Sequence, residues 1–142
     1  MPKTYRAKDP FQFYTRLHVS ESTGMRAVNI EEFLWHLKKV PGSSIYHHTH
    51  RYLQQHQYLS PEPPNDFAYW ILSELGEDEL AEEIAAVDII QFETIRALRE
   101  KIIFVIERYL KKNPLMKLKF SHKGREFYFI KSVSFVFPTY FF

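Results

Sequence analysis

In the run from Glu126 to Phe137 eight of the twelve residues are aromatic or β-branched, and this run constrains the fold more than any other part of the chain. Such a run is typical of a β-strand, in which successive side chains point to opposite faces. Both faces are apolar here, because Phe127, Phe129, Val133 and Phe135 alternate with Tyr128, Ile130 and Val136. A strand of this kind needs cover on both faces or a neighbour at its edge. The rest of the chain therefore has to supply that cover.

Two segments are candidate partners for this strand. The segment 117–120 alternates Lys with apolar residues, and residues 122–125 read as a turn, so the end of the chain predicts an antiparallel β-hairpin. The aromatic segment 11–15 also alternates, which makes it a candidate N-terminal strand that joins the hairpin. We expect residues 1–10 to form a loose arm.

The middle of the chain predicts about five helices. Their approximate ranges are 30–39, 45–57, 66–75, 78–86 and 94–112, and the last has the clearest helical spacing of apolar residues. Asn29 and either Asn65 or Asp66 are candidate N-caps, and Gly76 suits a helix C-terminus. With no internal repeat and no linker, the sequence predicts a mainly helical α+β fold in a single domain over residues 1–142, with a C-terminal antiparallel β-hairpin.

Several classes of protein are excluded by composition. The chain has no cysteine, which removes disulfides, thiolate metal sites and cysteine nucleophiles. No apolar run is long enough for a transmembrane helix, and the N-terminus lacks the apolar core of a secretory signal. We therefore expect a soluble, cytoplasmic protein that does not enter a membrane.

The charge is distributed unevenly along the chain. The net charge is +2, but residues 1–61 carry +4, residues 62–107 carry −9 and residues 108–142 carry +7. Solvated helical faces beside a Lys-rich hairpin explain this pattern, and so does a dipolar surface that orients a partner. We do not expect nucleic-acid binding, because the acidic middle repels a polyanion.

Four of the seven histidines lie between His47 and His56, and they form the chemically richest segment. On a regular helix His47 and His50 face the same way, so they and Asp66, across a Pro-rich loop, are candidate ligands for a divalent metal. His48 and, in that loop, Glu62 are the substitute ligands. The alternative is that these histidines only hydrogen-bond to their surroundings, since no HExxH motif is present.

The same region offers candidate ligand-binding residues, namely Tyr46, His48, Arg51 and Trp70. Tyr46 and Arg51 would orient an anionic ligand. Trp70 has an equally simple reading as a core residue. No nucleophile elbow, Walker A loop or dinucleotide-binding motif is present, so catalytic residues remain unassigned and the sequence does not decide whether the chain is an enzyme.

Two groups of residues resemble an uncharacterised prokaryotic domain family. They are the segment that contains Ser44-Ile45-Tyr46-His47 and the segment Asn65-Asp66-Phe67-Ala68-Tyr69-Trp70. The similarity extends to the Phe-Pro-Thr element at 137–139 and covers most of the chain. The resemblance implies no particular activity, and it implies that longer relatives continue past that element.

The C-terminus ends in three aromatic residues, Tyr140, Phe141 and Phe142, although chain ends usually extend into water. This end either docks on its own fold, packs on another chain, or is truncated. Together with the missing catalytic motifs and the split charge, it favours a non-catalytic protein-interaction or regulatory module that forms a homo-oligomer or binds a protein through the C-terminal strand. The alternative is a small-ligand or metal site, with hydrolysis as one activity, built from His47, His50 and Asp66.

Overall fold

The computed structural model describes residues 11–56 and 64–141. The expected N-terminal arm, Glu62 with most of the Pro-rich loop, and Phe142 lie outside the described residues, as do the side chains of residues 11–16, 56 and 137–141. The elements, in chain order, are β1 (Phe11–Ala27), α1 (Ile30–Leu37), α2 (Gly42–Tyr46), the π-helix η1 (His47–Arg51), α3 (Tyr52–His56), α4 (Asp66–Leu75), α5 (Asp78–Ala85), the 3-10 helix η2 (Ile89–Gln91), α6 (Ile95–Lys112), the 3-10 helix η3 (Pro114–Leu118) and β2 (Phe127–Phe141). The predicted α+β class with an antiparallel sheet is confirmed.

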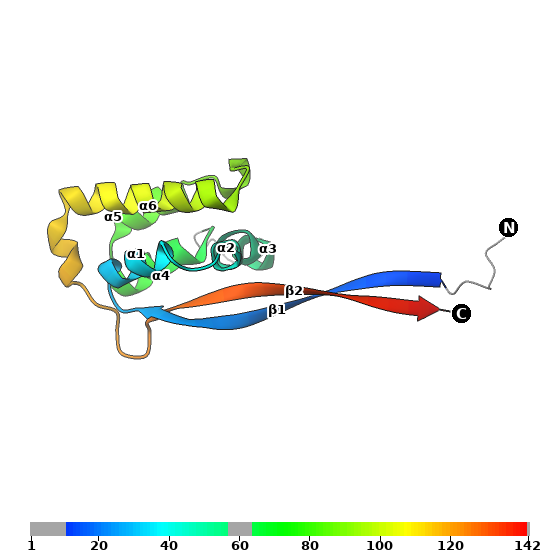
Figure 1. Cartoon of the computed structure of the whole chain (residues 1–142). Coiled ribbons are helices and arrows are strands. Elements are labelled where there is room, and N and C mark those ends of the chain that lie inside the picture. The colour runs from blue at the N-terminus through cyan, green and yellow to red at the C-terminus, as the bar shows by residue number, and fades with distance from the viewer. Residues whose placement is uncertain (1–10, 57–63, 142) are drawn as a thin grey trace.

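The sheet is a ribbon of two long antiparallel strands, β1 and β2 (Figure 1). The register runs from Phe11 opposite Phe141 to Ala27 opposite Phe127, with an irregularity between Ser22 and Arg26. Gly24 lies in that irregularity with φ at +82°, a conformation that favours glycine. The N-terminal strand is therefore much longer than the segment 11–15 that the sequence predicted, and it pairs with the whole of β2.

The predicted strand at 117–120 is wrong. Pro114 begins the 3-10 helix η3, which lasts to Leu118, and only Met116 of this helix is buried. Because β1 already pairs along β2, the C-terminal strand has no need of the segment 117–120 as a hairpin partner. The predicted turn is present, since the Arg125 N–H donates to the His122 carbonyl at 2.9 Å.

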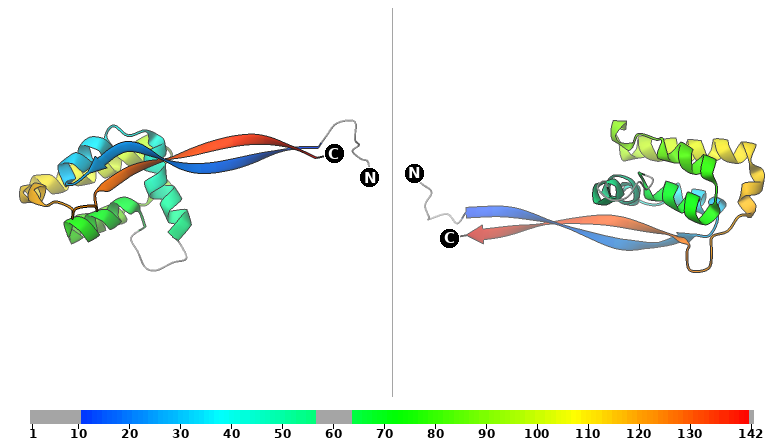
Figure 2. Two further views of the ribbon diagram at one scale, coloured as in Figure 1. Left: turned by 90° about the horizontal axis from the view of Figure 1, so that it is seen from below. Right: turned by 180° about the vertical axis from the view of Figure 1, so that it is seen from behind.

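The helices lie together on one side of the ribbon, and the ribbon runs on past them (Figures 1 and 2). Four of the predicted helices are confirmed as α1, α4, α5 and α6. Asn29, Asn65 and Thr94 cap three of them, each through a side-chain oxygen that accepts a backbone N–H. In the part of the chain that the structure describes, no helix is both long enough and apolar enough to cross a membrane.

An aromatic cluster forms the centre of the core between the helices and the ribbon. Phe33 of α1 is fully buried and stacks on Trp70, with ring centroids 5.5 Å apart. Its ring also makes edge contacts with Phe67 of α4 and with Phe127 of β2. The high aromatic content of the sequence is thus used to join α1, α4 and β2 at one point.

Candidate functional site

The site begins with a departure from regular helix between residues 42 and 56. One helix was expected over 45–57, but α2, the π-helix η1 and α3 follow one another there. The hydroxyl of buried Thr49 donates to the Ile45 carbonyl at 2.6 Å, and the Tyr52 N–H donates to the His47 carbonyl five residues earlier. A π-turn adds one residue to a helical turn, so it changes which histidines face the core.

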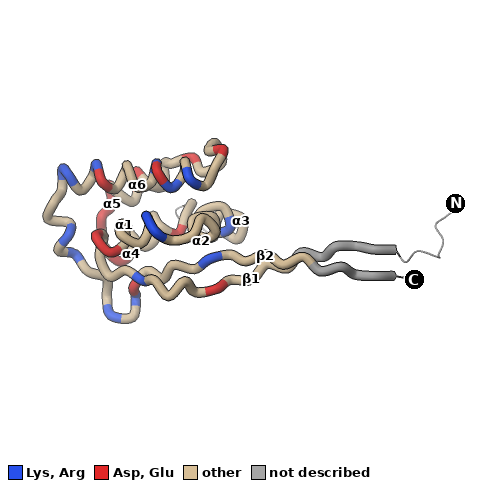
Figure 3. Tube along the Cα trace, viewed as in Figure 1, with Lys and Arg blue, Asp and Glu red and all other residues tan. Residues whose placement is uncertain are grey.

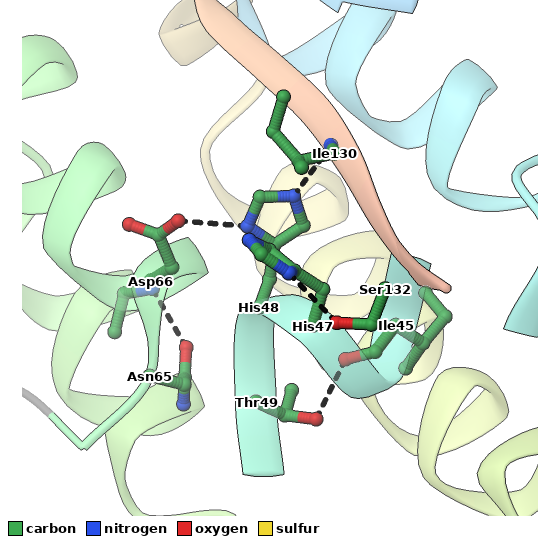
Figure 4. A network of polar contacts seen from close by, with 9 residues as sticks. Ile45, His47, His48, Thr49, Asn65, Asp66, Ile130 and Ser132 are labelled. Carbon is green, nitrogen blue, oxygen red and sulfur yellow. Dashed lines mark hydrogen bonds and ion pairs between the residues drawn. The ribbon is translucent and has the colours of Figure 1, made fainter. Parts of the chain in front are cut away.

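His48 is the histidine that this turn buries, with 2% of its surface exposed. Its Nε2 accepts the backbone N–H of Ile130 at 2.9 Å, and its Nδ1 lies 2.7 Å from Oδ2 of Asp66 (Figure 4). Because a backbone N–H only donates, Nε2 carries the lone pair and Nδ1 carries the proton that Asp66 accepts. Both ring nitrogens are therefore engaged, and His48 joins η1 to α4 and β2 as a neutral ring.

His47 lies beside His48 but points to a different partner. Its Nδ1 is 2.9 Å from the hydroxyl of Ser132 on β2 (Figure 4). Burial lowers the pKa of His47 to about 4, with the charge of Arg51 acting in the same direction and that of Asp66 acting against both. His47 is therefore neutral near pH 7.

His50 and Tyr46 face one another instead of joining this group. Their rings stack with centroids 5.7 Å apart, and Nδ1 of His50 lies 3.3 Å from the Thr49 hydroxyl. Among the residues that the structure describes, no three His, Asp or Glu side chains gather as metal ligands. The carboxylate of the predicted metal set, that of Asp66, is hydrogen-bonded to His48. The metal site of His47, His50 and Asp66 stays a prediction.

Asp66 reaches His48 because its neighbour caps the helix. Asn65 is fully buried, and its side-chain oxygen accepts the Ala68 N–H at 2.9 Å while its amide donates to the Ile84 carbonyl at 3.3 Å. The choice between Asn65 and Asp66 as N-cap, which the sequence left open, is thereby decided. The Asp66 carboxylate stays at the start of α4, one-third exposed and available to His48.

Four of the predicted site residues line one pocket of about 360 Å³ between η1, α4 and the start of β2: His47, His48, Asp66 and Trp70. Tyr46, Arg51 and His50 do not line it. Trp70 is both a core residue and a wall of the pocket, since it is 7% exposed and its indole N–H donates to the Arg125 carbonyl at 2.9 Å. The two readings of Trp70 are therefore compatible.

Sequence reasoning missed the side of this pocket that comes from the turn before β2. Glu74 of α4 accepts hydrogen bonds from the His122 backbone N–H at 3.2 Å and from Arg125 Nη1 at 3.3 Å. Burial acts to raise the pKa of Glu74, but the hydrogen bonds from His122 and the charge of Arg125 lower it overall. These contacts hold the turn against α4. About fifty positions separate the partners in sequence, so no local spacing could reveal them.

Comparisons with known proteins give a family and a structural relative. The model of a family described as a family of unknown function (DUF5752) matches residues 8–142. A solved structure of OrfY from Thermoproteus tenax is similar, with a TM-score of 0.72 and 28% sequence identity over 95% of this chain. The match covers 59% of the OrfY chain, so this chain spans less than two thirds of that relative. No curated protein matches the chain.

Proposed function

The chain belongs to the family of unknown function DUF5752, and we propose that it is a non-catalytic protein-interaction module that binds a second copy of itself through β1. The observation that carries this proposal is the ribbon of β1 and β2, which runs on past the helices (Figure 1). Leu17 is 50% exposed on it, Phe135 42% and Val136 51%. A two-stranded ribbon is only marginally stable on its own in water, and its edges can pair with another strand.

The charge pattern also sets the ribbon apart from the helices. Figure 3 shows Lys, Arg, Asp and Glu gathered on the helices and the loops, whereas the described part of the ribbon carries few of them. Glu21 and Lys131 are directly opposite each other and form an ion pair at 3.7 Å. Charges that would repel an added strand are therefore sparse along the described part of the ribbon.

The helices cover part of the outer edge of β2, which favours β1 as the pairing edge. The Ile130 N–H points away from β1, because it donates to His48 of η1. Ser132, two residues along the same edge, contacts His47 of the same helix. The outer edge of β1 lies on the opposite side of the ribbon from these histidines. The sequence pointed to the C-terminal strand as the interface, and the covered edge moves our proposal to β1.

The sequence of β1 suits antiparallel pairing with itself. Leu17 and Val19 lie opposite Phe135 and Val133, so these four residues share one face of the ribbon. A two-fold axis through His18 would place Leu17 of one copy opposite Val19 of the other, twice. The resulting sheet of four strands would have one continuous apolar face. A closed two-fold pairing of this kind is the commonest form of self-association.

Sedimentation velocity of the full chain over a wide range of concentrations tests the proposal. We expect a dimer that the double variant L17K/V19K converts to a monomer with an unchanged circular dichroism spectrum. The matched control is I90K/L115K, which adds the same charges at apolar residues that are 72% and 76% exposed away from the ribbon, and it should remain dimeric. A wild-type monomer at the highest concentration, or a dimer that L17K/V19K leaves intact, would overturn the proposal.

A small-ligand site is the second candidate function, and the pocket between η1 and α4 favours it. The pocket brings together His47, His48, Asp66 and Trp70, and its volume of about 360 Å³ lies within the range of ligand sites. A divalent metal on His47, His50 and Asp66 would require His50 to leave Tyr46 and Asp66 to share its carboxylate with His48. Metal content of untagged protein, compared with that of H47N/H50N, tests this metal set, and equal uptake by both proteins would reject it.

A further inference from the structure

We propose that the pocket between η1, α4 and the start of β2 binds an organic cation, with an alkylammonium group as the part it recognises. This inference rests on the second candidate function above, because it names the ligand class of that pocket. The proposal stands on three properties of the pocket walls: their net charge, their aromatic rings and the acceptors that their carboxylates still offer.

The pocket has a negative lining. Asp66, Glu74 and Glu126 contribute three carboxylates, whereas Arg125 contributes a single guanidinium. Arg125 is paired with Glu74, with 3.3 Å between Nη1 and Oε2. The ring nitrogens of His48 are engaged by the Ile130 N–H and by Asp66, and Nδ1 of His47 lies 2.9 Å from the Ser132 hydroxyl. The charge that remains to meet a ligand is that of Asp66 and Glu126.

The carboxylates of Asp66 and Glu126 can each accept further hydrogen bonds. A carboxylate provides about four acceptor sites. In the part of the chain that the structure describes, Asp66 uses one for His48 at 2.7 Å, and Glu126 accepts the Tyr128 hydroxyl at 3.3 Å. An ammonium group, which only donates hydrogen bonds and carries a positive charge, is complementary to both.

Aromatic rings form the rest of the walls. Tyr69 and Tyr128 are 39% and 47% exposed, and the buried rings of Trp70 and Phe127 also line the pocket. The hydrogen bond from Trp70 to the Arg125 carbonyl fixes the indole in place. Aromatic faces attract cations, and cages of such rings are a common way to bind alkylammonium groups. The same lining disfavours an anion, and Tyr46 and Arg51, the residues predicted to orient one, lie outside the pocket.

Choline and its neutral isostere 3,3-dimethyl-1-butanol are matched probes, because they differ in the charged nitrogen alone. Titrations followed by the indole N–H resonance of Trp70 should show choline binding at least tenfold more tightly than the alcohol. N-acetyl-lysine methylamide is the third probe, because the side chain of a protein lysine could also supply an alkylammonium group. If it binds more tightly than choline, the source is a protein side chain, and if choline binds more tightly, the source is a free amine. Either result supports the cation class.

Variants separate the roles of charge and ring. We expect E126Q to weaken choline binding about tenfold, whereas E82Q, on the exposed face of α5, should leave it unchanged. Tyr128→Leu should weaken binding as well, and Tyr128→Phe, which keeps the ring, should restore it.

Two outcomes overturn the inference in different ways. Equal affinity for choline and the alcohol would reject the cation class while the pocket remains a ligand site. No shift of the Trp70 resonance with either probe or with the lysine derivative would reject the ligand site itself.

Discussion

His48 is the residue on which three elements converge. Its ring lies 4.7 Å from the ring of Phe127 and 5.4 Å from that of Phe67, and its two nitrogens bond to α4 and β2. A buried backbone N–H without an acceptor is costly, and so is a carboxylate that loses its donor. His48 therefore holds the site together as a structural residue, and its lone pair is already committed to Ile130.

Replacing His48 by Phe tests this role, because the ring and its packing stay while both hydrogen bonds are lost. We expect the free energy of unfolding to fall by about 2–3 kcal/mol, since the Ile130 N–H and the Asp66 carboxylate lose their partner. Urea denaturation measures the change. His50→Phe is the control, because that ring stacks on Tyr46 at a half-buried position. Equal losses in the two variants would show that the hydrogen bonds of His48 are unimportant.

His47 predicts a dependence of stability on pH. Burial, with the charge of Arg51 adding to it, lowers its pKa in the folded chain from 6.5 to about 4. Between these values the unfolded chain binds a proton that the folded chain does not, so stability falls as the pH drops below 6.5. Because His47 is only half-buried, we expect a loss of about 1 kcal/mol between about pH 7 and pH 5.

Urea denaturation of wild type and His47→Gln at both pH values isolates this contribution. The loss on acidification should be smaller in the variant, since Gln does not titrate. Glu74 does not interfere in this window. Its pKa is lowered below 4.5 in the folded chain, so the stability that it contributes is lost only at a lower pH. An identical loss in both proteins would assign the pH dependence to other groups.

At the scale of elements, the helix caps were predictable and the π-helix was not. Asn29 and Asn65 were candidate N-caps because they precede apolar runs with helical spacing, which is a local pattern, whereas Thr94, the N-cap of α6, was expected as the first residue of that helix. Which histidines of η1 face the core depends on the hydrogen bond of the Thr49 hydroxyl and on contacts with β2, which lies some eighty positions later. The sequence therefore identified the histidine segment and Asp66, but it paired the carboxylate first with His47 and His50 and gave His48, its partner in the structure, only as a substitute.

The N-caps of α1 and α4 differ in the number of hydrogen bonds that their side chains make, and this difference predicts unequal losses of stability. Asn65 is fully buried and makes two hydrogen bonds, one within α4 and one to the Ile84 carbonyl of α5, whereas Asn29 caps α1 alone. We expect Asn65→Ala to cost about 2–3 kcal/mol and Asn29→Ala about 1 kcal/mol. Urea denaturation of both variants measures the difference, and a larger loss for Asn29→Ala would contradict the structure.

At the scale of the whole molecule, the ribbon divides into a covered root and a distal part. At the root, Phe129 is fully buried and the Ile130 N–H is bound by His48. Farther along, Leu17 and Phe135 are opposite each other and about half exposed. The sequence predicted a strand that is apolar on both faces and needs cover, and among the side chains that the structure describes the helices cover those at the root, such as Phe127 and Phe129.

Hydrogen exchange should report this division. We expect the Ile130 amide to exchange slowly at every concentration. The outward-facing amides of His18 and Ser20 in β1 should become more protected as the concentration rises, because self-association would bury them, whereas those of Leu17 and Val19 already face β2. The variant L17K/V19K should lack that dependence, and α6 serves as the internal reference. Exchange of β1 that does not change with concentration would contradict pairing through this edge.

The order of the two strands along the chain has a consequence for synthesis on the ribosome. β1 precedes the helices that the structure describes and β2 follows them, so the pair Ala27 and Phe127 is separated by 100 positions. At roughly 5–20 residues per second, β1 emerges about 5–20 s before its partner. The helices have time to pack in that interval, while the apolar residues of β1 stay unpaired. A nascent chain of this kind needs protection for its first strand until the last one has been translated.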